Sequence, residues 1–357
     1  MKKCIAMLLT LTLILGLLSG CSGTTVVYYS DCTCDANSHT PPATQPQAPV
    51  TSDGTPVKTG LAIVTSVSDS VPAGEKDGKI AYDVTLVAVT VDDNGVIDSC
   101  VIDSLPANVT FDTAGQITCD LTAAIRTKDE QGEDYGMKAY AGSKYEWNEQ
   151  AAALAAYAEG KTVAELISGA VGEDGKAVDA DLAATASIYL GGYVSAIEAA
   201  VASAQHLGAV KGDTLKLACI PGIKSSVSAG EKDGTAQLDA DVTALTMNGD
   251  VITSCIIDSL QAKINFNAAG EITSDLTAAI LTKNGLGENY GMKAWGGAKY
   301  EWNEQAASFA AYVTGKTVAE VAGIAVTETT APADADLSAT VTIAIGGFQA
   351  LIAKAAA

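Results

Sequence analysis

Two similar segments hold the residues of this chain with the most obvious chemistry. The first runs from Asp179 to Ser187 (DADLAATAS), and the second runs from Asp334 to Thr342 (DADLSATVT). Each places carboxyl and hydroxyl groups among small residues, and each then leads into a Gly-Gly-aromatic sequence and an Ala-rich helical stretch. The hydroxyls are candidate sites of modification or ligand contact. The alternative is that these threonines only favour a β-strand that closes each half.

Other kinds of chemistry are excluded by composition. The chain has two histidines, His39 and His206, and neither lies in a motif, so the main chemistry is not a zinc site or a Ser-His-Asp triad. Of the eight cysteines, Cys100 and Cys255 occupy equivalent apolar stretches and are predicted to be small buried residues, and no spacing indicates a disulfide scaffold. The net charge of −21 disfavours nucleic acid as a partner.

An internal repeat organises the chain. The stretch from about Gly60 to Gln205 returns from about Leu217 to Ala355, mostly at an offset of 155 positions. Strings such as GEKDG, KYEWNEQAA and GKTVAE occur once in each copy. A unit of about 150 residues is large enough to bury its own core, so we expect two tandem domains, 60–207 and 210–357.

The N-terminus carries a leader and a tether. Two lysines precede an apolar run, Ala6–Leu18, which is too short to span a bilayer comfortably. The run ends in Leu-Ser-Gly-Cys21, which resembles the lipobox of bacterial lipoproteins; this implies removal of residues 1–20 and lipidation of Cys21. The alternative is a secretory signal with a chance cysteine. Residues 21–59 are rich in Ser, Thr, Pro and Gln and are predicted to be a flexible linker. The expected location is the extracellular face of the cell membrane.

Alternation and turn signals predict antiparallel hairpins in each copy. The first joins Ile80–Val91 to Val96–Ile102 through Asp-Asn-Gly, and its counterpart joins Val242–Met247 to Val251–Ile257 through Asn-Gly. A further short hairpin is expected from Asn108–Phe111 to Gln116–Thr118.

Helices follow the hairpins. Apolar residues spaced three to four apart predict a helix over Lys144–Glu159. Capping boxes at Thr162–Glu165 and Thr317–Glu320 predict the start of another helix in each copy. A short strand near Ala184–Leu190 and a final helix over Tyr193–Ala204 are expected to close the first copy. The fold class is therefore α+β, with a small antiparallel sheet and packed helices in each repeat.

With these motifs in place, each repeat resembles FMN-binding domains, and the chain resembles the FMN-binding surface lipoproteins of Gram-positive extracellular electron transfer. The resemblance is carried by the Asp179 and Asp334 segments, by Thr-Lys followed by Tyr-Gly-Met-Lys, by the Glu-Trp-Asn-Glu-Gln stretch and by Gly-Lys-Thr. It covers both repeats and, through the lipobox, almost the whole mature chain.

The resemblance implies that a transferase moves FMN from FAD onto a threonine hydroxyl. By position the acceptors are Thr185 and Thr340, which gives two covalent FMN groups in each chain. The family motif has a glycine two residues before the threonine, where this chain has Ala183 and Ser338. Neighbouring hydroxyls are therefore also candidate acceptors: Ser187 and Thr342 nearby, and Thr122 and Thr277 farther along the sequence.

Further residues are implied to contact the flavin through an aromatic and methionine wall, a lysine near its electron-rich edge, and an acidic residue in the turn. They are Tyr135, Met137, Lys138, Trp147 and Asp181 in the first copy, and Tyr290, Met292, Lys293, Trp302 and Asp336 in the second. Each has a plainer interpretation. The tryptophans are equally explained as core anchors, the lysines as solvated charges, and the aspartates as residues that orient the turn.

The expected function is electron carriage, not catalysis, so no catalytic residue and no metal are assigned. Its partners would be the FMN transferase, a membrane quinol-linked donor, an external electron acceptor and the membrane itself through the lipid anchor. Two alternatives stay open: a lipoprotein that binds a small ligand without redox chemistry, and a surface module that engages a partner protein.

Overall fold

Long antiparallel hairpins form the centre of the protein in the computed structural model, which describes residues 54–357. The leader (1–20), Cys21 and the linker up to residue 53 lie outside the described residues. The first sheet has the order β1-β2-β3, with β1 at Lys58–Ser66, β2 at Gly78–Val91 and β3 at Ile97–Phe111. The second has the order β4-β5-β6, with β4 at Thr214–Gly222, β5 at Gly234–Asn248 and β6 at Val251–Phe266.

Turn chemistry sets the hairpins. At the β2–β3 turn the carboxylate of Asp92 accepts hydrogen bonds from the backbone N–H groups of Asn94 and Val96, both at 2.8 Å. Gly95 takes φ 78°, a left-handed conformation that favours glycine. The matching turn between β5 and β6 uses Gly249 at φ 62°. Both predicted hairpins are therefore confirmed, although their strands run much longer than expected.

The two sheets pack face to face through alternate residues. Ile80, Val84 and Leu86 of β2 lie in one core cluster with Leu238 and Val242 of β5. The phenyl rings of Phe111 and Phe266 stack with centroids 4.1 Å apart, and the hydroxyl of Tyr82 donates to the carbonyl of Ala236 at 2.8 Å. Residues of opposite parity face the other way, toward the helices.

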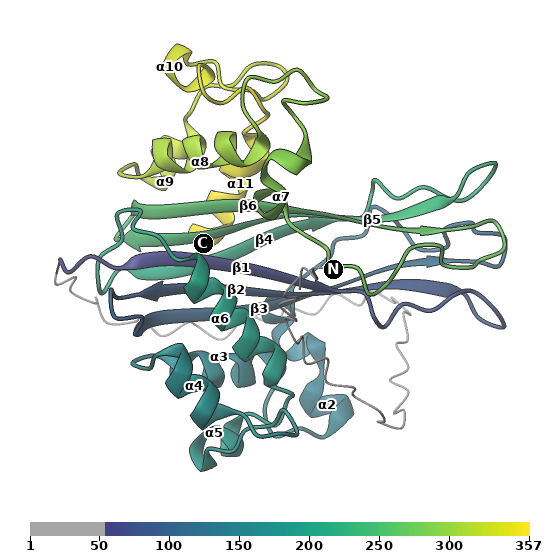
Figure 1. Cartoon of the computed structure of the whole chain (residues 1–357), viewed down its shortest axis with the longest axis horizontal. Helices are drawn as coiled ribbons and strands as arrows, with labels where there is room; N and C mark the ends of the chain where they lie inside the picture. Colours follow the sequence, from purple (N-terminus) through teal and green to yellow (C-terminus); the bar gives the residue numbers. More distant parts are fainter. Residues whose placement is uncertain (1–53) are drawn as a thin grey trace, which may run out of the picture. The chain divides into compact units, whose positions relative to one another are not determined.

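Helices cover the outer face of each sheet (Figure 1). Those after the first sheet are α1 (Lys128–Gln131), α2 (Met137–Ala141), α3 (Trp147–Ala158), α4 (Val163–Ala170), α5 (Ala180–Thr185) and α6 (Gly191–Ser203). Those after the second are α7 (Lys283–Leu286), α8 (Trp302–Val313), α9 (Val318–Ala322), α10 (Ala335–Ser338) and α11 (Gly346–Ala356). Short 3-10 turns occupy Gly132–Tyr135 and Gly287–Tyr290. The layers therefore run helices, sheet, sheet, helices, with a core between each pair of layers.

The α+β class is confirmed, with two separate three-stranded antiparallel sheets and packed helices. The helix expected over Lys144–Glu159 is α3, and the final helix expected over Tyr193–Ala204 is α6. Both capping boxes are present: the hydroxyls of Thr162 and Thr317 accept from the backbone N–H groups of Glu165 and Glu320.

One predicted strand is wrong. The closing strand near Ala184–Leu190 is instead the end of helix α5 followed by an irregular segment, because Asp179 caps a short helix that the alanines favour. Asn108–Phe111 is the end of β3, and the chain turns back after it as expected: Phe111 pairs with Ile117, and the Thr118 N–H donates to the Thr110 carbonyl at 2.9 Å. Pro106 lies within β3 and made the full length of this strand hard to recognise from the sequence. The proline is tolerated because β3 lies at the edge of its sheet.

The fold begins earlier than the predicted end of the linker. Val57 is buried, Lys58 starts β1, and Thr59 pairs with Gln205 through backbone hydrogen bonds of 2.9 and 3.0 Å. None of the helices within residues 54–357 has the length and apolar character that crossing a membrane requires.

Candidate functional site

The start of α3 binds the segment that contains three of the predicted residues, Tyr135, Met137 and Lys138. The helix begins at Trp147, and the backbone N–H of its N-cap Glu146 donates to the carboxylate of Glu149 at 2.7 Å. The buried carboxylate of Glu146 accepts from the backbone N–H groups of Met137 and Lys138 at 2.8 and 3.1 Å. A charge-assisted pair of this kind fixes the start of α2 against α3.

One turn farther along α3, Gln150 joins that segment to the candidate acceptor segment. Its side chain is fully buried, and its amide nitrogen donates to the Ser143 hydroxyl at 3.1 Å and to the Tyr145 carbonyl at 3.0 Å. Its amide oxygen accepts from the backbone N–H groups of Ser187 and Ile188 at 2.7 and 3.1 Å, and from the Ser187 hydroxyl at 3.1 Å. Thus Glu146 and Gln150, four residues apart on one helix face, bind both segments.

The second half repeats these contacts. Glu301 accepts from the backbone N–H groups of Met292 and Lys293 at 2.8 and 3.0 Å. Gln305 donates to the Tyr300 carbonyl at 3.0 Å and accepts from the N–H and hydroxyl of Thr342 at 2.8 and 3.1 Å. Sequence reasoning missed both pairs, although the repeated Glu-Trp-Asn-Glu-Gln string contains them.

The candidate acceptor threonines lie at the ends of short helices. Thr185 is the last residue of α5, half-buried, and its hydroxyl donates to the carbonyls of Leu182 and Asp181 at 3.1 and 3.3 Å. Thr340 follows α10 by two residues, and its hydroxyl donates to the Leu337 carbonyl at 3.3 Å. In both halves the preceding alanine is exposed.

The other candidate acceptors have different surroundings. Ser187 and Thr342 are exposed, with their hydroxyls bonded to the buried glutamines. Thr122 and Thr277 are also exposed, but each hydroxyl donates to a nearby aspartate at 2.7 Å, and neither contacts the α3 or α8 hydrogen bonds described above.

The aspartates of the acceptor segments have separate tasks. Asp179 is the N-cap of α5, and its carboxylate accepts from the backbone N–H groups of Asp181 and Leu182, both at 3.0 Å. Asp181 and Asp336 are exposed in the first turns of α5 and α10, where a negative charge stabilises a helix. This favours the interpretation that they orient the turn.

Both predicted tryptophans are core residues. Trp147 is 2% exposed and Trp302 is 6% exposed. The indole nitrogen of Trp147 donates to the Tyr193 hydroxyl at 3.1 Å, and Trp302 packs edge-on against Phe348. So little exposed area leaves neither ring a free face for a ligand, which favours the core-anchor interpretation.

The predicted tyrosines and lysines are more accessible. Tyr135 and Tyr290 pack at the edges of the outer cores, where the ammonium groups of Lys128 and Lys283 lie 5.3 and 5.2 Å from the ring centres. Lys128, the lysine of the Thr-Lys motif, is buried and also lies 5.3 Å from the ring centre of Trp147, although the sequence assigned it no contact with a ligand.

Lys138 and Lys293 form exposed ion pairs with Glu149 and Glu304 at 2.7 and 2.9 Å. The hydrogen bond that the Lys138 ammonium donates to the Glu149 carboxylate raises the pKa of Lys138 and lowers the pKa of Glu149. On the solvent side, the first pair joins α2 to α3, and the second joins the turn that contains Lys293 to α8.

The N-termini of α6 and α11 follow the acceptor segments. Neither has a side-chain cap, and each begins with two glycines, so no side chain accepts from the first N–H groups. The Tyr189 hydroxyl lies 3.1 Å from where a Cβ on Gly191 would stand, and the Cβ of Thr330 lies 3.3 Å from the same point on Gly346. The two ends differ, because Oδ2 of Asp241 lies 3.5 Å from where a Cβ on Gly347 would stand. Burial raises the pKa of Asp241.

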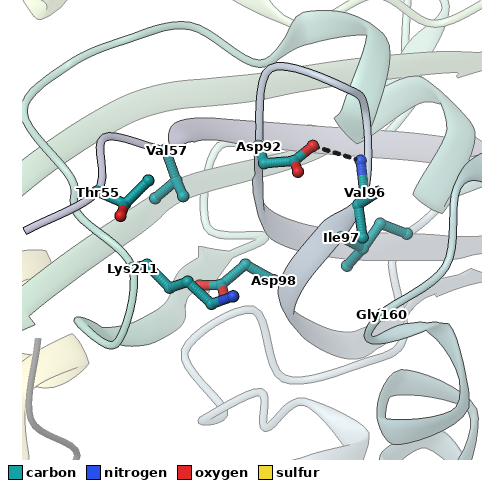
Figure 2. A pocket seen from close by; sticks show the side chains of 8 residues that line it. All are labelled: Thr55, Val57, Asp92, Val96, Ile97, Asp98, Gly160 and Lys211. Carbon is teal, nitrogen blue, oxygen red and sulfur yellow. Dashed lines mark hydrogen bonds between the residues drawn. The ribbon is translucent and has the colours of Figure 1, made fainter. Parts of the chain in front are cut away.

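A separate pocket of about 310 Å³ lies at the β2–β3 turn (Figure 2). Its lining residues are Thr55, Val57, Asp92, Val96, Ile97, Asp98, Gly160 and Lys211. Its charged groups are the carboxylates of Asp92 and Asp98 and the ammonium of Lys211. None of the residues predicted to attach or contact the flavin lines it. Within residues 54–357, no group of three or more His, Cys, Asp or Glu side chains is placed to hold a metal ion.

Comparison with known proteins gave no match: no family model fits the chain, and no curated protein or solved structure is significantly similar to it.

Proposed function

We propose that the chain is a lipid-anchored extracellular flavoprotein that carries electrons outward from a membrane donor, with its two halves acting as tandem FMN-binding domains. The observation that carries this proposal is the twofold occurrence of one arrangement. On α3 and on α8 a buried glutamate binds the tyrosine–methionine–lysine segment, a buried glutamine four residues later binds a hydroxyl-bearing segment, and an uncapped helix N-terminus follows.

The residues present fit attachment of FMN through its phosphate. Transfer from FAD makes an ester between the threonine oxygen and the FMN phosphorus, breaks the pyrophosphate bond, and releases AMP and the hydroxyl proton. Thr185 must give up its bonds to two helix carbonyls, at a cost of about 1 kcal/mol each. Helix α5 has six residues and one buried side chain, Leu182, so it can unwind into a transferase at modest cost.

When bound, the flavin supplies the redox chemistry. The chain's own residues then hold it in place. The first N–H groups of α6 are available to the phosphate, and the Glu146 and Gln150 contacts keep the neighbouring segments fixed. In the second half the nearby carboxylate of Asp241 makes the N-terminus of α11 a weaker anion site.

The two attachment sites lie on opposite outer layers. Leu182 belongs to the core between the first sheet and its helices, and Leu337 belongs to the corresponding core of the second sheet. Figure 1 shows α5 and α10 at opposite ends of the layered stack. Three layer spacings of about 10 Å put roughly 30 Å between them. We therefore propose two independent carriers and no internal relay.

Binding of a small ligand without redox chemistry is the second candidate, and the pocket at the β2–β3 turn favours it. Intact-mass measurement distinguishes the two functions. Protein from cells that contain the transferase should carry two FMN groups, and Thr185→Ala should remove one. An unmodified mass after co-expression refutes flavin carriage and leaves the ligand-binding function.

A further inference from the structure

The most exposed aromatic side chains occupy equivalent positions in the two halves. Tyr140 is 89% exposed and Trp295 is 83% exposed. Within the described part of the chain, the other large exposed aromatic is Tyr189, whose counterpart in the second half is Ala344. A large aromatic side chain exposed to solvent at the equivalent position of both halves indicates a binding partner.

Each ring lies over a glycine. The backbone N–H groups of Tyr140 and Trp295 donate to the carbonyls of Gly136 and Gly291, both at 2.9 Å. These glycines take φ 80° and 83°, and a Cβ on either would stand 2.5 or 2.3 Å from a ring carbon. One side of each ring therefore packs on the glycine, and the other side faces solvent.

The exposed rings are connected to the acceptor segments through one helix face. Glu301 on α8 holds Met292 and Lys293, which begin the turn that carries Trp295. Gln305 lies four residues later, about 6 Å along the helix, and holds the Thr342 segment. Glu146 and Gln150 do the same for Tyr140 in the first half.

We propose that Tyr140 and Trp295 are the stacking surfaces for the isoalloxazine ring attached to their own half. This inference rests on the proposed function. An aromatic side chain attracts a planar conjugated ring in an offset stack. A ligand attached to each half explains why one ring is needed on each of two opposite layers, where a single flat partner could not contact both.

Flavin fluorescence tests the proposal, because a stacked tryptophan or tyrosine quenches flavin emission. The experiment uses the full chain co-expressed with the transferase and carrying Thr185→Ala, so that only the second half bears FMN. Adding Trp295→Leu should raise flavin emission roughly fivefold, because one aromatic pair favours the stacked flavin over the unstacked flavin by about that ratio. The matched control is Tyr140→Leu in the same background, which removes an equally exposed ring from the half without FMN and should leave emission unchanged.

Intact mass separates this inference from the proposed function. One FMN per chain with unchanged emission in Trp295→Leu overturns the stacking role and leaves flavin carriage standing. No added FMN in the parent overturns both. Because Trp295 is exposed, the variant should unfold at the same urea concentration as its parent, which verifies that a change in emission reflects the lost ring.

Discussion

Replacing Gln305 with leucine should destabilise the second half without leaving a cavity. Leucine is of similar size, but it cannot accept from the backbone N–H groups of Thr342 and Ile343 or donate to the Tyr300 carbonyl. These three part-buried groups lose their partner at about 1 kcal/mol each, so the free energy of unfolding should fall by about 3 kcal/mol.

Urea denaturation followed by circular dichroism measures this change. The matched control is Ser308→Ala, on the exposed face of the same helix, which should change stability by less than about 0.5 kcal/mol. Gln305→Glu keeps an acceptor for both N–H groups but buries a carboxylate against the Tyr300 carbonyl, so it should also destabilise the second half. If Gln305→Leu is as stable as the parent, the buried glutamine does not hold the acceptor segment and the argument for the site fails.

Three further predictions concern other parts of the fold. Tyr82→Phe removes the buried hydrogen bond to the Ala236 carbonyl and should lower stability by about 1 kcal/mol in the same urea assay; no change would show that the two sheets pack without it. Burial raises the pKa of Asp103 to about 6, from an ordinary value of 3.8. The folded state thus binds this proton more tightly than the unfolded chain does. The contribution of the protonated Asp103 to the free energy of unfolding is therefore full below pH 3.8 and is lost as pH rises through about 6. Asp103→Asn should flatten that part of the stability profile, and an unchanged profile would contradict it. Because Thr185 and Thr340 lie on opposite layers, removing the FMN at one by substitution to alanine should leave the midpoint potential at the other unchanged, as measured by spectroelectrochemistry. A large shift would reveal coupling between them.

Local chemistry made much of the fold predictable. The hairpins follow from alternating residues around Asn-Gly turns, and the helix starts follow from the Thr-x-x-Glu boxes, which depend on contacts within four residues. The strand expected near Ala184–Leu190 failed because Thr185 was given more weight than the N-cap Asp179 and the alanines after it.

Long-range packing could not be predicted in the same way. The apolar residues of β2 include neighbours such as Leu86 and Val87, which shows that both faces are buried, but not that one faces the second sheet. The stacking of Phe111 on Phe266 therefore became visible only in the fold.

The site was predictable only in part. The repeated motifs contained its residues, but they left open whether Trp147 contacts a cofactor or anchors the core, and its burial favours the core. Gln150 had no role of its own in the sequence analysis, and only the topology brings it against Ser187. Tyr140 and Trp295 carried no signal beyond their shared position, since exposure is a property of the folded chain.

The mass of the intact protein tests the central claim most directly. Chain purified from cells that contain an FMN transferase should be heavier than the unflavinylated chain by two FMN groups, and the double variant Thr185→Ala, Thr340→Ala should be heavier by none. A mass without any flavin in the co-expressed parent, or two flavins retained in the double variant, would contradict the account.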